Sequence, residues 1–478
     1  TYNELGQHAQ AIACYGQALS LNNASAEIHS NLGVARMEQG DLQGAIDSFQ
    51  QALALEPHHP EAHRHLALCL NGRQHPEALQ QAIASLEANA NNPKRYHLHF
   101  AIGKYKLDRG DPDALDPFLA GNALRHQQLQ GRWRMPDLQE LLALNADPSP
   151  LRDPAADDAP APGQAANSDL PPVIFIVGLP RSGSTLVETI LSTNPALRDL
   201  GEVAYLQQAL RRSSDADGIR RAYGACVANS VSSTVALTDK YLYNFFYCQL
   251  IARCFTNSHL VHIYRNPMDN LLSTFTNHFP KGNEWTTNLD NSVRFYHLYR
   301  QLMEAHEQAL PGRILHLNYD QLTREPEPQI RRLLDHCGLA WSEAYLRPER
   351  SRRVIQTASA VQARAPIHAS SVGRWRRYAA VLQPYADQLE ALGYVPFPSE
   401  DSLRRVQLAA LACSRENTTS SCDEARRLAD PLLDHPRLPV TCKDLLWSIV
   451  QTAKPAASNS FARREAINDP ASRLLLVC

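Results

Sequence analysis

The stretch PPVIFIVGLPRSGSTLVETIL, residues 171–191, decides the fold of this chain. It begins with an unbroken β-branched and aromatic run over residues 173–177, typical of a strand covered on both faces of a parallel sheet. The turn GLPRSGST follows at 178–185, and apolar residues then recur at helical spacing over 186–191. Such a strand, turn and helix start direct several backbone N–H groups and the positive end of the helix dipole at one point. The sequence therefore predicts an α/β domain with a phosphate site at this turn.

The spacing of the turn is that of a nucleotide-binding loop with one change. Gly178 and Gly183 have the frame of the Walker loop, G-x-x-x-x-G-K-[ST]. Ser184 stands where a nucleoside triphosphatase needs a lysine, and Arg181 offers a planar guanidinium instead. PRSGSTL, residues 180–186, resembles the 5′-phosphosulfate loop of sulfotransferases, which use 3′-phosphoadenosine 5′-phosphosulfate (PAPS) without a metal. The resemblance implies that PAPS is bound by Arg181, Ser182, Gly183, Ser184 and Thr185. A turn that binds nothing is the alternative.

Length and charge limit the other classes of function. At 478 residues the chain has the length of about three domains of ~150 residues. Its 47 basic and 49 acidic residues give a net charge of −2, so no overall field attracts nucleic acid or an anionic membrane. No window approaches the ~20 apolar residues of a membrane span. The missing initiator Met and a first repeat that begins halfway predict a natural N-terminus upstream.

The cysteines bear on the compartment. The 10 cysteines show neither C-x-x-C pairs nor the Cys/His spacing of a zinc site. In a chain of this length they predict free thiols rather than a disulfide framework. A reducing, cytoplasmic location is the expectation.

Residues 1–131 carry an internal repeat. A glycine, two alanines, an aromatic residue and a leucine recur 34 positions apart, as Gly6 and Gly40, Ala11 and Ala45, Tyr15 and Phe49, Ala18 and Ala52, and Leu21 and Leu55. The pattern resembles the tetratricopeptide repeat, which implies an all-α solenoid whose concave face holds a peptide or protein. The alternatives are that the array packs only against its neighbouring domain, or against a second copy of the chain in a homodimer.

Composition marks the domain boundaries. The Pro-, Ala- and Asp-rich residues 145–172 contain almost no large apolar groups, so they predict an extended linker. The expected domains are therefore the repeats over 1–131, a connector and linker over 132–172, the α/β domain over 173–398, and a helical extension over 399–478 that shows no motif.

Two segments beyond the first helix resemble catalytic segments of sulfotransferases. EVAYL at 202–206 resembles the E-V-x-aromatic form of the heparan branch, which implies that Glu202 is the general base. In the tyrosylprotein branch the usual base position corresponds to Val203. LTDKYLYNF at 237–245 resembles T-D-K-x-x-x-N-F of bacterial sulfotransferases with tetratricopeptide repeats. This implies that Lys240 lies beside the bridging oxygen of PAPS, where a cation stabilises the leaving phosphate. The alternatives are a glutamate that only pairs with a helix dipole and a solvated lysine.

A second strand-to-helix turn occurs further along. HLVHIY at 259–264 predicts a buried strand, and it runs directly into RNPMDNLLS at 265–273. Arg265 and Ser273 can close on one anion from two sides, which resembles the 3′-phosphate site R-[DN]-P-x-D-x-x-x-S of sulfotransferases. Asn277 stands where the tyrosylprotein branch has a further arginine. The alternative is an arginine that caps the sheet edge and a serine within a helix.

Two later segments complete the predicted nucleotide site. RILHLNYDQL at 313–322 predicts a third strand and resembles the family's R-Y-E-D-L strand end, which implies that Tyr319 lies near the nucleotide. The pattern S-x2-Q-x3-P-x8-W, found in a loop that folds over the nucleotide of tyrosylprotein sulfotransferases, is reproduced by Ser359, Gln362, Pro366 and Trp375. The resemblance implies that Ser359 and Arg374 contact PAPS. A solvated cationic face is the alternative.

The combination resembles the bacterial tetratricopeptide-repeat sulfotransferases. It implies a P-loop-like parallel α/β fold and in-line transfer of the sulfuryl group of PAPS to a hydroxyl acceptor, such as a protein tyrosine or a glycan. Glu202 would be the base, Lys240 and Arg181 would stabilise the leaving phosphate, and no metal would be needed. A P-loop nucleotide kinase is an alternative, opposed by Ser184 and by the lack of a clear Mg²⁺-holding aspartate at a strand end. A non-catalytic repeat scaffold is another.

Overall fold

The computed structural model describes residues 2, 7–129, 132–153, 170–228, 235–279, 281–350, 366–394, 400–433, 438 and 440–477. The chain divides into two compact units, Thr1–Leu382 and Gln383–Cys478. Among the described residues, no helix has the length and apolar character needed to cross a membrane.

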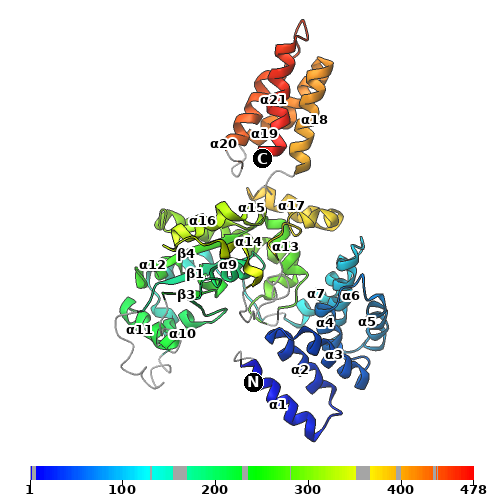
Figure 1. The fold of residues 1–478 in the computed structure, drawn as a ribbon, viewed down its shortest axis with the longest axis vertical. Helices are drawn as coiled ribbons and strands as arrows, with labels where there is room; N and C mark the ends of the chain where they lie inside the picture. Colours follow the sequence, from blue (N-terminus) through cyan, green and yellow to red (C-terminus); the bar gives the residue numbers. More distant parts are fainter. Residues whose placement is uncertain are drawn as a thin grey trace. The chain divides into compact units, whose positions relative to one another are not determined.

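The first unit begins with paired antiparallel helices, drawn in blue in Figure 1. They are α1 (His8–Leu21), α2 (Ala26–Gln39), α3 (Leu42–Leu55), α4 (Pro60–Cys69), α5 (Pro76–Ala88), α6 (Tyr96–Arg109) and α7 (Leu115–Gln128). A Cβ on Gly33 of α2 would lie 2.5 Å from the ring of Phe49 on α3, and a Cβ on Gly103 of α6 would lie 2.5 Å from the ring of Phe118 on α7. The glycines therefore let each pair approach with an aromatic ring between the helices. The predicted all-α repeat array is confirmed.

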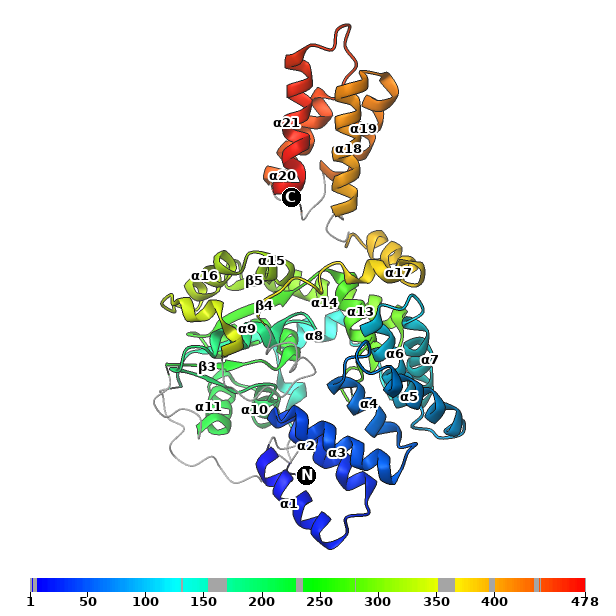
Figure 2. The ribbon, with the colours of Figure 1, turned by 45° about the vertical axis from the view of Figure 1, so that its right-hand side comes forward.

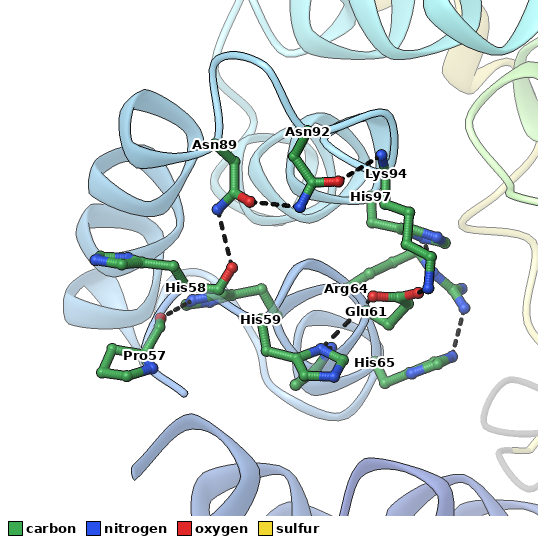
Figure 3. Close-up of polar contacts among 12 residues, drawn as sticks. Pro57, His58, His59, Glu61, Arg64, His65, Asn89, Asn92, Lys94 and His97 are labelled. Atoms are coloured by element: carbon green, nitrogen blue, oxygen red, sulfur yellow. Dashed lines mark hydrogen bonds and ion pairs between the residues drawn. The ribbon is translucent and has the colours of Figure 1, made fainter. Parts of the chain in front are cut away.

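Polar side chains join neighbouring repeats (Figure 3). Arg64 Nε on α4 donates a hydrogen bond to His97 Nδ1 on α6 at 3.0 Å. Lys94 Nζ lies 2.6 Å from Glu61 Oε1, and Asn89 Nδ2 donates to the carbonyl of His58 at 2.9 Å. These contacts join α4 and the residues before it to α6 and to the connection between α5 and α6, in addition to apolar packing.

The second part of this unit is a parallel sheet with strand order β2-β3-β1-β4-β5. Its strands are β1 (Val173–Val177), β2 (Leu197–Asp199), β3 (Ala236–Asp239), β4 (His259–Tyr264) and β5 (Ile314–Asn318). The predicted strands at 173–177, 259–264 and 313–322 are confirmed. β2 and β3 contain only 3 and 4 residues, too few to show a clear apolar pattern in the sequence.

Helices cover both faces of the sheet (Figure 2). They include α9 (Ser184–Leu191), α10 (Tyr205–Arg212), α11 (Ala216–Val227), α12 (Cys248–Cys254), α13 (Pro267–Phe275), α14 (Leu289–Ala309), α15 (Tyr319–Arg324) and α16 (Pro326–His336). Ile174 and Ile176 of β1 pack in one buried cluster with Val187 of α9 and Leu333 of α16. Phe175 points to the opposite face, where its ring contacts Tyr223 of α11 and Phe255, which directly follows α12. The unbroken apolar run of β1 is thus explained by burial on both faces.

The repeats contact the α/β domain through α6 and α7. Asn122 Nδ2 of α7 donates to the carbonyl of Phe275 at 2.8 Å, and Arg125 Nη2 donates to the carbonyl of Phe279 at 2.6 Å. The ring of His278 stacks on Tyr96 of α6, with centroids 5.6 Å apart and planes 8° apart. This contact is one of the roles expected for the repeats, and it fixes the chain immediately after α13.

The connecting region contains α8 (Leu138–Ala146), whose Asn145 Nδ2 donates to the carbonyl of Phe246 at 2.7 Å. The remaining part of the predicted linker that lies in 154–169 is outside the described residues.

The second unit is helical, with α18 (Glu400–Glu416), α19 (Thr419–Leu433), α20 (Val440–Thr452) and α21 (Phe461–Val477), while α17 (Ala379–Ala391) spans the division between the units. Cys413 of α18 and Cys422 of α19 form a disulfide with Cα atoms 4.5 Å apart. The prediction of free thiols is therefore wrong for these two cysteines, and it is also wrong for Cys442, which is disulfide-bonded as well. The tight turn from α18 into α19 brings them together, although their separation of 9 residues matches no standard cysteine motif.

Candidate functional site

Each strand of the sheet is followed by a residue that the sequence predicts for the site. Glu202 follows β2, Lys240 follows β3, Arg181 lies in the turn after β1, Arg265 follows β4, and Tyr319 follows β5. Because the strands are parallel, their carboxyl ends meet at one edge, where α/β proteins commonly bind ligands. The strand order therefore arranges the predicted residues along one edge in the order just given.

The turn after β1 has a backbone that few residues can adopt. Gly178 has a φ of 147°, and a Cβ there would lie 2.3 Å from the carbonyl oxygen of Ile263 on β4. Gly183 has a φ of 105°, and a Cβ there would lie 2.2 Å from the ring of Tyr319. Arg181 has a φ of 64° without being glycine, which costs conformational energy. The following helix, α9, begins at Ser184 and includes Thr185, both of which are buried.

Arg181 connects this turn to the second strand-to-helix turn. Its Nε donates a hydrogen bond to Ser273 Oγ on α13 at 3.1 Å. Burial lowers the pKa of Arg181 most, the positive charges of Arg265 and Arg374 act in the same direction, and the resulting value is about 10. The guanidinium remains charged at neutral pH, in a place where positive charges gather.

Arg265 lies next to Arg181 at the same edge of the sheet. Its Nη1 donates to the backbone carbonyl of Arg181 at 3.3 Å, and its Nη2 donates to the carbonyl of Ser371 at 2.8 Å. The guanidinium lies 4.8 Å from the centroid of the Tyr319 ring, and Tyr319 Oη is 3.0 Å from Ser371 Oγ. The two predicted anion turns thus form one continuous cationic site.

Two donors at this site are buried without a partner among the described residues. Arg265 is only 6% exposed, and its Nε has no hydrogen-bond acceptor there. The same holds for Ser182 Oγ in the turn after β1, whose side chain is also buried. Buried donors are normally satisfied, because leaving one unpaired costs about 1–3 kcal/mol. Both atoms are therefore available to an anionic ligand.

A segment further along the chain is held against this site by Asp269 of α13. Its carboxylate accepts a hydrogen bond from the backbone N–H of Gly373 at 2.6 Å and another from that of Trp375 at 3.0 Å. Arg374 lies between these two residues. Asp269 was not selected from the sequence, although its place in R-N-P-x-D was the available signal. Ser359 lies within 351–365, outside the described residues, so its predicted contact stays a prediction.

Lys240 is buried between two carboxylates. Its side chain has no exposed surface, and Nζ donates to Glu202 Oε1 at 2.7 Å. Glu188 Oε2, on α9, lies 3.7 Å from the same Nζ, and Glu188 is also fully buried. The Glu202 side chain is 43% exposed. Glu188 was missed from the sequence; the available signal is a carboxylate among the apolar positions of LVETIL.

An aspartate stands at the end of a strand next to β1, and its surroundings bear on whether it could hold a metal ion. Asp239 ends β3 and is fully buried, and burial raises its pKa to about 7. Its carboxylate accepts from Tyr223 Oη at 2.9 Å, from Asn244 Nδ2 at 3.0 Å and from the N–H of Tyr241 at 3.0 Å. These internal donors occupy the oxygens that a metal would use. Across the described ranges, no group of three or more His, Cys, Asp or Glu is placed to hold a metal ion.

Comparison with known protein families agrees with this division of the chain. The model of the sulfotransferase family matches residues 172–223 and 207–343. Two tetratricopeptide-repeat models match residues 1–40 and 26–59.

Individual proteins are similar to this chain over only part of its length. An uncharacterised protein of Aquifex aeolicus is 31% identical over 244 residues, which are 45% of this chain and 32% of that protein. Omega-hydroxy-beta-dihydromenaquinone-9 sulfotransferase Stf3 of Mycobacterium bovis is 34% identical over 109 residues, 21% of this chain and 28% of the relative. The matched region thus spans about a third or less of each relative. The crystal structure of mouse sulfotransferase SULT7A1 complexed with PAP has a TM-score of 0.33 at 14% identity, covering 50% of this chain and 89% of that one.

Proposed function

We propose, because this chain joins tetratricopeptide repeats to a sulfotransferase-family domain, that it transfers the sulfuryl group of PAPS to a hydroxyl group of an acceptor. The observation that carries the proposal is the convergence of Arg181 and Arg265 at the ends of the adjacent strands β1 and β4. Each arginine belongs to its own strand-to-helix turn. Two anion turns side by side suit a nucleotide with phosphate groups at both its 5′ and 3′ positions.

The free donors support this choice of ligand. Ser182 Oγ belongs to the turn predicted for the 5′-phosphosulfate, and Arg265 Nε belongs to the turn predicted for the 3′-phosphate. An oxygen of a phosphate group at either place would satisfy a donor that is otherwise buried unpaired. Tyr319 and Ser371 border the second turn and would lie beside the 3′ end of the nucleotide.

The remaining residues have roles that follow from their places along the sheet edge. PAPS supplies the sulfuryl group, whose bond to the 5′-phosphate breaks as the bond to the acceptor oxygen forms, and adenosine 3′,5′-bisphosphate leaves. Glu202, partly exposed beyond β2, accepts the proton of the acceptor hydroxyl. Lys240 and Arg181, on the two strands between Glu202 and Arg265, stabilise the charge of the leaving phosphate.

The repeats favour a peptide or protein as the acceptor, because stacked helical repeats present an extended concave surface. A tyrosine hydroxyl of such a partner is the first candidate. A glycan or a hydroxylated lipid is the alternative, the latter because the relative Stf3 is an omega-hydroxy-beta-dihydromenaquinone-9 sulfotransferase. Incubation with labelled PAPS and fractionated cell extract would identify the class that takes up sulfate. Self-association of the repeats stays a further prediction.

Calorimetry with adenosine 3′,5′-bisphosphate tests the proposal directly. We expect tight binding that does not change when magnesium is replaced by a chelator. MgATP, which lacks the 3′-phosphate, should bind more weakly. The Gly178-x4-Gly183 frame favours a kinase as the second candidate, and tighter binding of MgATP would replace our proposal by that one. If neither nucleotide binds, the alternative of a non-catalytic repeat scaffold would be favoured.

A further inference from the structure

The buried ammonium of Lys240 has two carboxylate neighbours that differ in their access to solvent. Glu202 is 43% exposed and makes the short contact of 2.7 Å, whereas Glu188 is fully buried at 3.7 Å. Glu202 approaches Lys240 from the loop beyond β2. Glu188 approaches it from α9, the helix that starts at the phosphate turn. The two carboxylates therefore reach the same ammonium from two different elements.

During the proposed reaction, Glu202 and Glu188 do not remain equivalent as counter-charges of Lys240. When Glu202 accepts the proton of the acceptor hydroxyl, it becomes neutral and no longer balances the charge of Lys240. Losing one partner of a buried ion pair is costly, because burial disfavours the charged form of the ammonium. The negative charge of the nucleotide then lies on one side of Lys240, and Glu188 is the carboxylate that remains beside it. A negative charge closed off from solvent and from the acceptor therefore holds the ammonium in place at this step.

We propose that Glu188 is a positioning residue that keeps Lys240 charged and in place while Glu202 is engaged with the acceptor. The inference rests on the proposed function and deepens it, since it assigns separate tasks to the two carboxylates. Glu202 gives up its ion pair with Lys240 when it takes the proton of the acceptor. Glu188 stays with Lys240 throughout, so the lysine is kept near the phosphate turn by the same helix that forms that turn.

The other charged groups around Lys240 cannot take this part. Asp239 precedes Lys240 on the chain, but its carboxylate is bound by Tyr223, Asn244 and the N–H of Tyr241. Burial and the nearby charge of Glu188 raise the pKa of Asp239, so this carboxyl group holds its proton more readily than usual. Arg181 carries a positive charge and opposes a second cation. Glu188 is thus the buried carboxylate that lies within ion-pair distance of Nζ.

The test measures the affinity for adenosine 3′,5′-bisphosphate by calorimetry from pH 6.5 to pH 9.5, which requires no knowledge of the acceptor. Glu202→Gln removes the charge of Glu202, as the proton of the acceptor would, and serves as the parent variant. Glu188→Gln is added to it, which keeps the shape of that side chain and removes its charge. We expect the affinity of the parent variant to change little over this range beyond the titration of the ligand itself. The ratio of the double-variant Kd to the parent Kd should rise about tenfold or more between the two ends, because one pKa unit corresponds to a tenfold change.

Matched variants separate this role from a structural one. In the same parent variant, Glu188→Asp retains the charge and should restore much of the alkaline affinity. Thr189→Val, also in the parent variant, removes a buried hydroxyl from the same helix that bonds to the carbonyl of Thr185, and should leave the pH dependence unchanged. In a Lys240→Met background, Glu188→Gln should no longer alter the pH dependence.

The outcomes distinguish the inference from the proposed function. If the parent variant binds the nucleotide and added Glu188→Gln leaves its pH dependence unchanged, the positioning role is refuted while the function stands. If wild type does not bind, the proposed function fails first. Should Glu188→Gln not fold, Glu188→Ala in the same parent decides: a loss of affinity at alkaline pH supports the role, and an unchanged pH dependence overturns it.

Discussion

Arg265 offers the clearest test at the level of a single side chain. It donates to the carbonyls of Arg181 and Ser371, and its Nε has no acceptor in the part of the chain that the structure describes. We expect Arg265→Ala to weaken binding of adenosine 3′,5′-bisphosphate by roughly 1.5–3 kcal/mol, the range of a charge-assisted hydrogen bond. Calorimetry measures the loss, with Arg253→Ala, an exposed arginine of α12, as control. Unchanged affinity in Arg265→Ala would remove the assignment of the 3′-phosphate site.

Glu202 can be tested by separating binding from transfer. Glu202→Gln removes the base but keeps a hydrogen-bonding side chain, and Lys240 retains Glu188. We therefore expect transfer of label from PAPS to the acceptor fraction to fall about 10²–10⁴-fold, with nucleotide affinity within a few-fold of wild type. Glu304→Gln, on the exposed surface of α14, is the matched control. Full activity in Glu202→Gln would assign the base to another group.

Sequence motifs located the residues whose roles are local to a turn, and missed those whose roles depend on packing. Arg181 and Arg265 follow predicted strands directly, so the strand positions alone place them at one edge. Glu188 and Asp269 gain their importance from groups far along the chain: Lys240 for the first, and the N–H groups of Gly373 and Trp375 for the second. Spacing within one helix cannot reveal such partners.

At the scale of elements, the contact between α6 and the chain after α13 is sensitive to acid. His97 and His278 pack against each other with ring centroids 4.9 Å apart. Burial lowers the pKa of His97 to about 2, and it lowers the pKa of His278 strongly as well, with Arg64 and Arg125 acting in the same direction. The folded state therefore holds both imidazoles neutral where an unfolded chain would protonate them.

The pH dependence follows from these depressed values. Above about pH 6.5 these histidines are neutral in both the folded and the unfolded chain, and they do not reduce the free energy of unfolding. As the pH falls from there toward the folded-state pKa values, the unfolded chain binds protons that the folded chain does not. The free energy of unfolding then falls by up to about 1.4 kcal/mol per pH unit for each histidine. Urea unfolding between pH 7.5 and pH 5 measures this loss. His278→Phe keeps a ring against Tyr96 and should flatten the dependence. His368→Phe, at an exposed histidine, should not; equal slopes for both variants would contradict the prediction.

The same scale shows which elements a sequence can predict. β1 and β4 are long enough to carry an apolar run that only a buried strand explains. β2 and β3 form because β1 already provides a parallel edge: Leu237 pairs with Val173, and Arg198 then pairs with Leu237. Short strands of this kind depend on long-range pairing, which leaves little trace in local composition.

At the scale of the whole molecule, the disulfide between Cys413 and Cys422 lies within the second unit. Cys413 and Cys422 close a short loop between α18 and α19, and both side chains are fully buried. Closing a loop of about ten residues stabilises a fold by roughly 2–3 kcal/mol in the chain-entropy model. We expect a Cys413→Ala, Cys422→Ala double variant of the full chain to lose hydrogen-exchange protection in α18 and α19. Peptides from the sheet should be unaffected, and unchanged protection of α18 and α19 would refute the stabilising role.

The order of the strands has an evolutionary consequence. Groups proposed to hold the donor lie beyond β1, β4 and β5, whereas the proposed base lies beyond β2, at the far end of the sheet. Mutations in the loop after β2 can therefore alter which molecule is modified without disturbing the nucleotide. A chimera carrying that loop from a homologous enzyme should inherit the homologue's acceptor preference and keep its own donor. Diversification within such an architecture would proceed from one side of the sheet only.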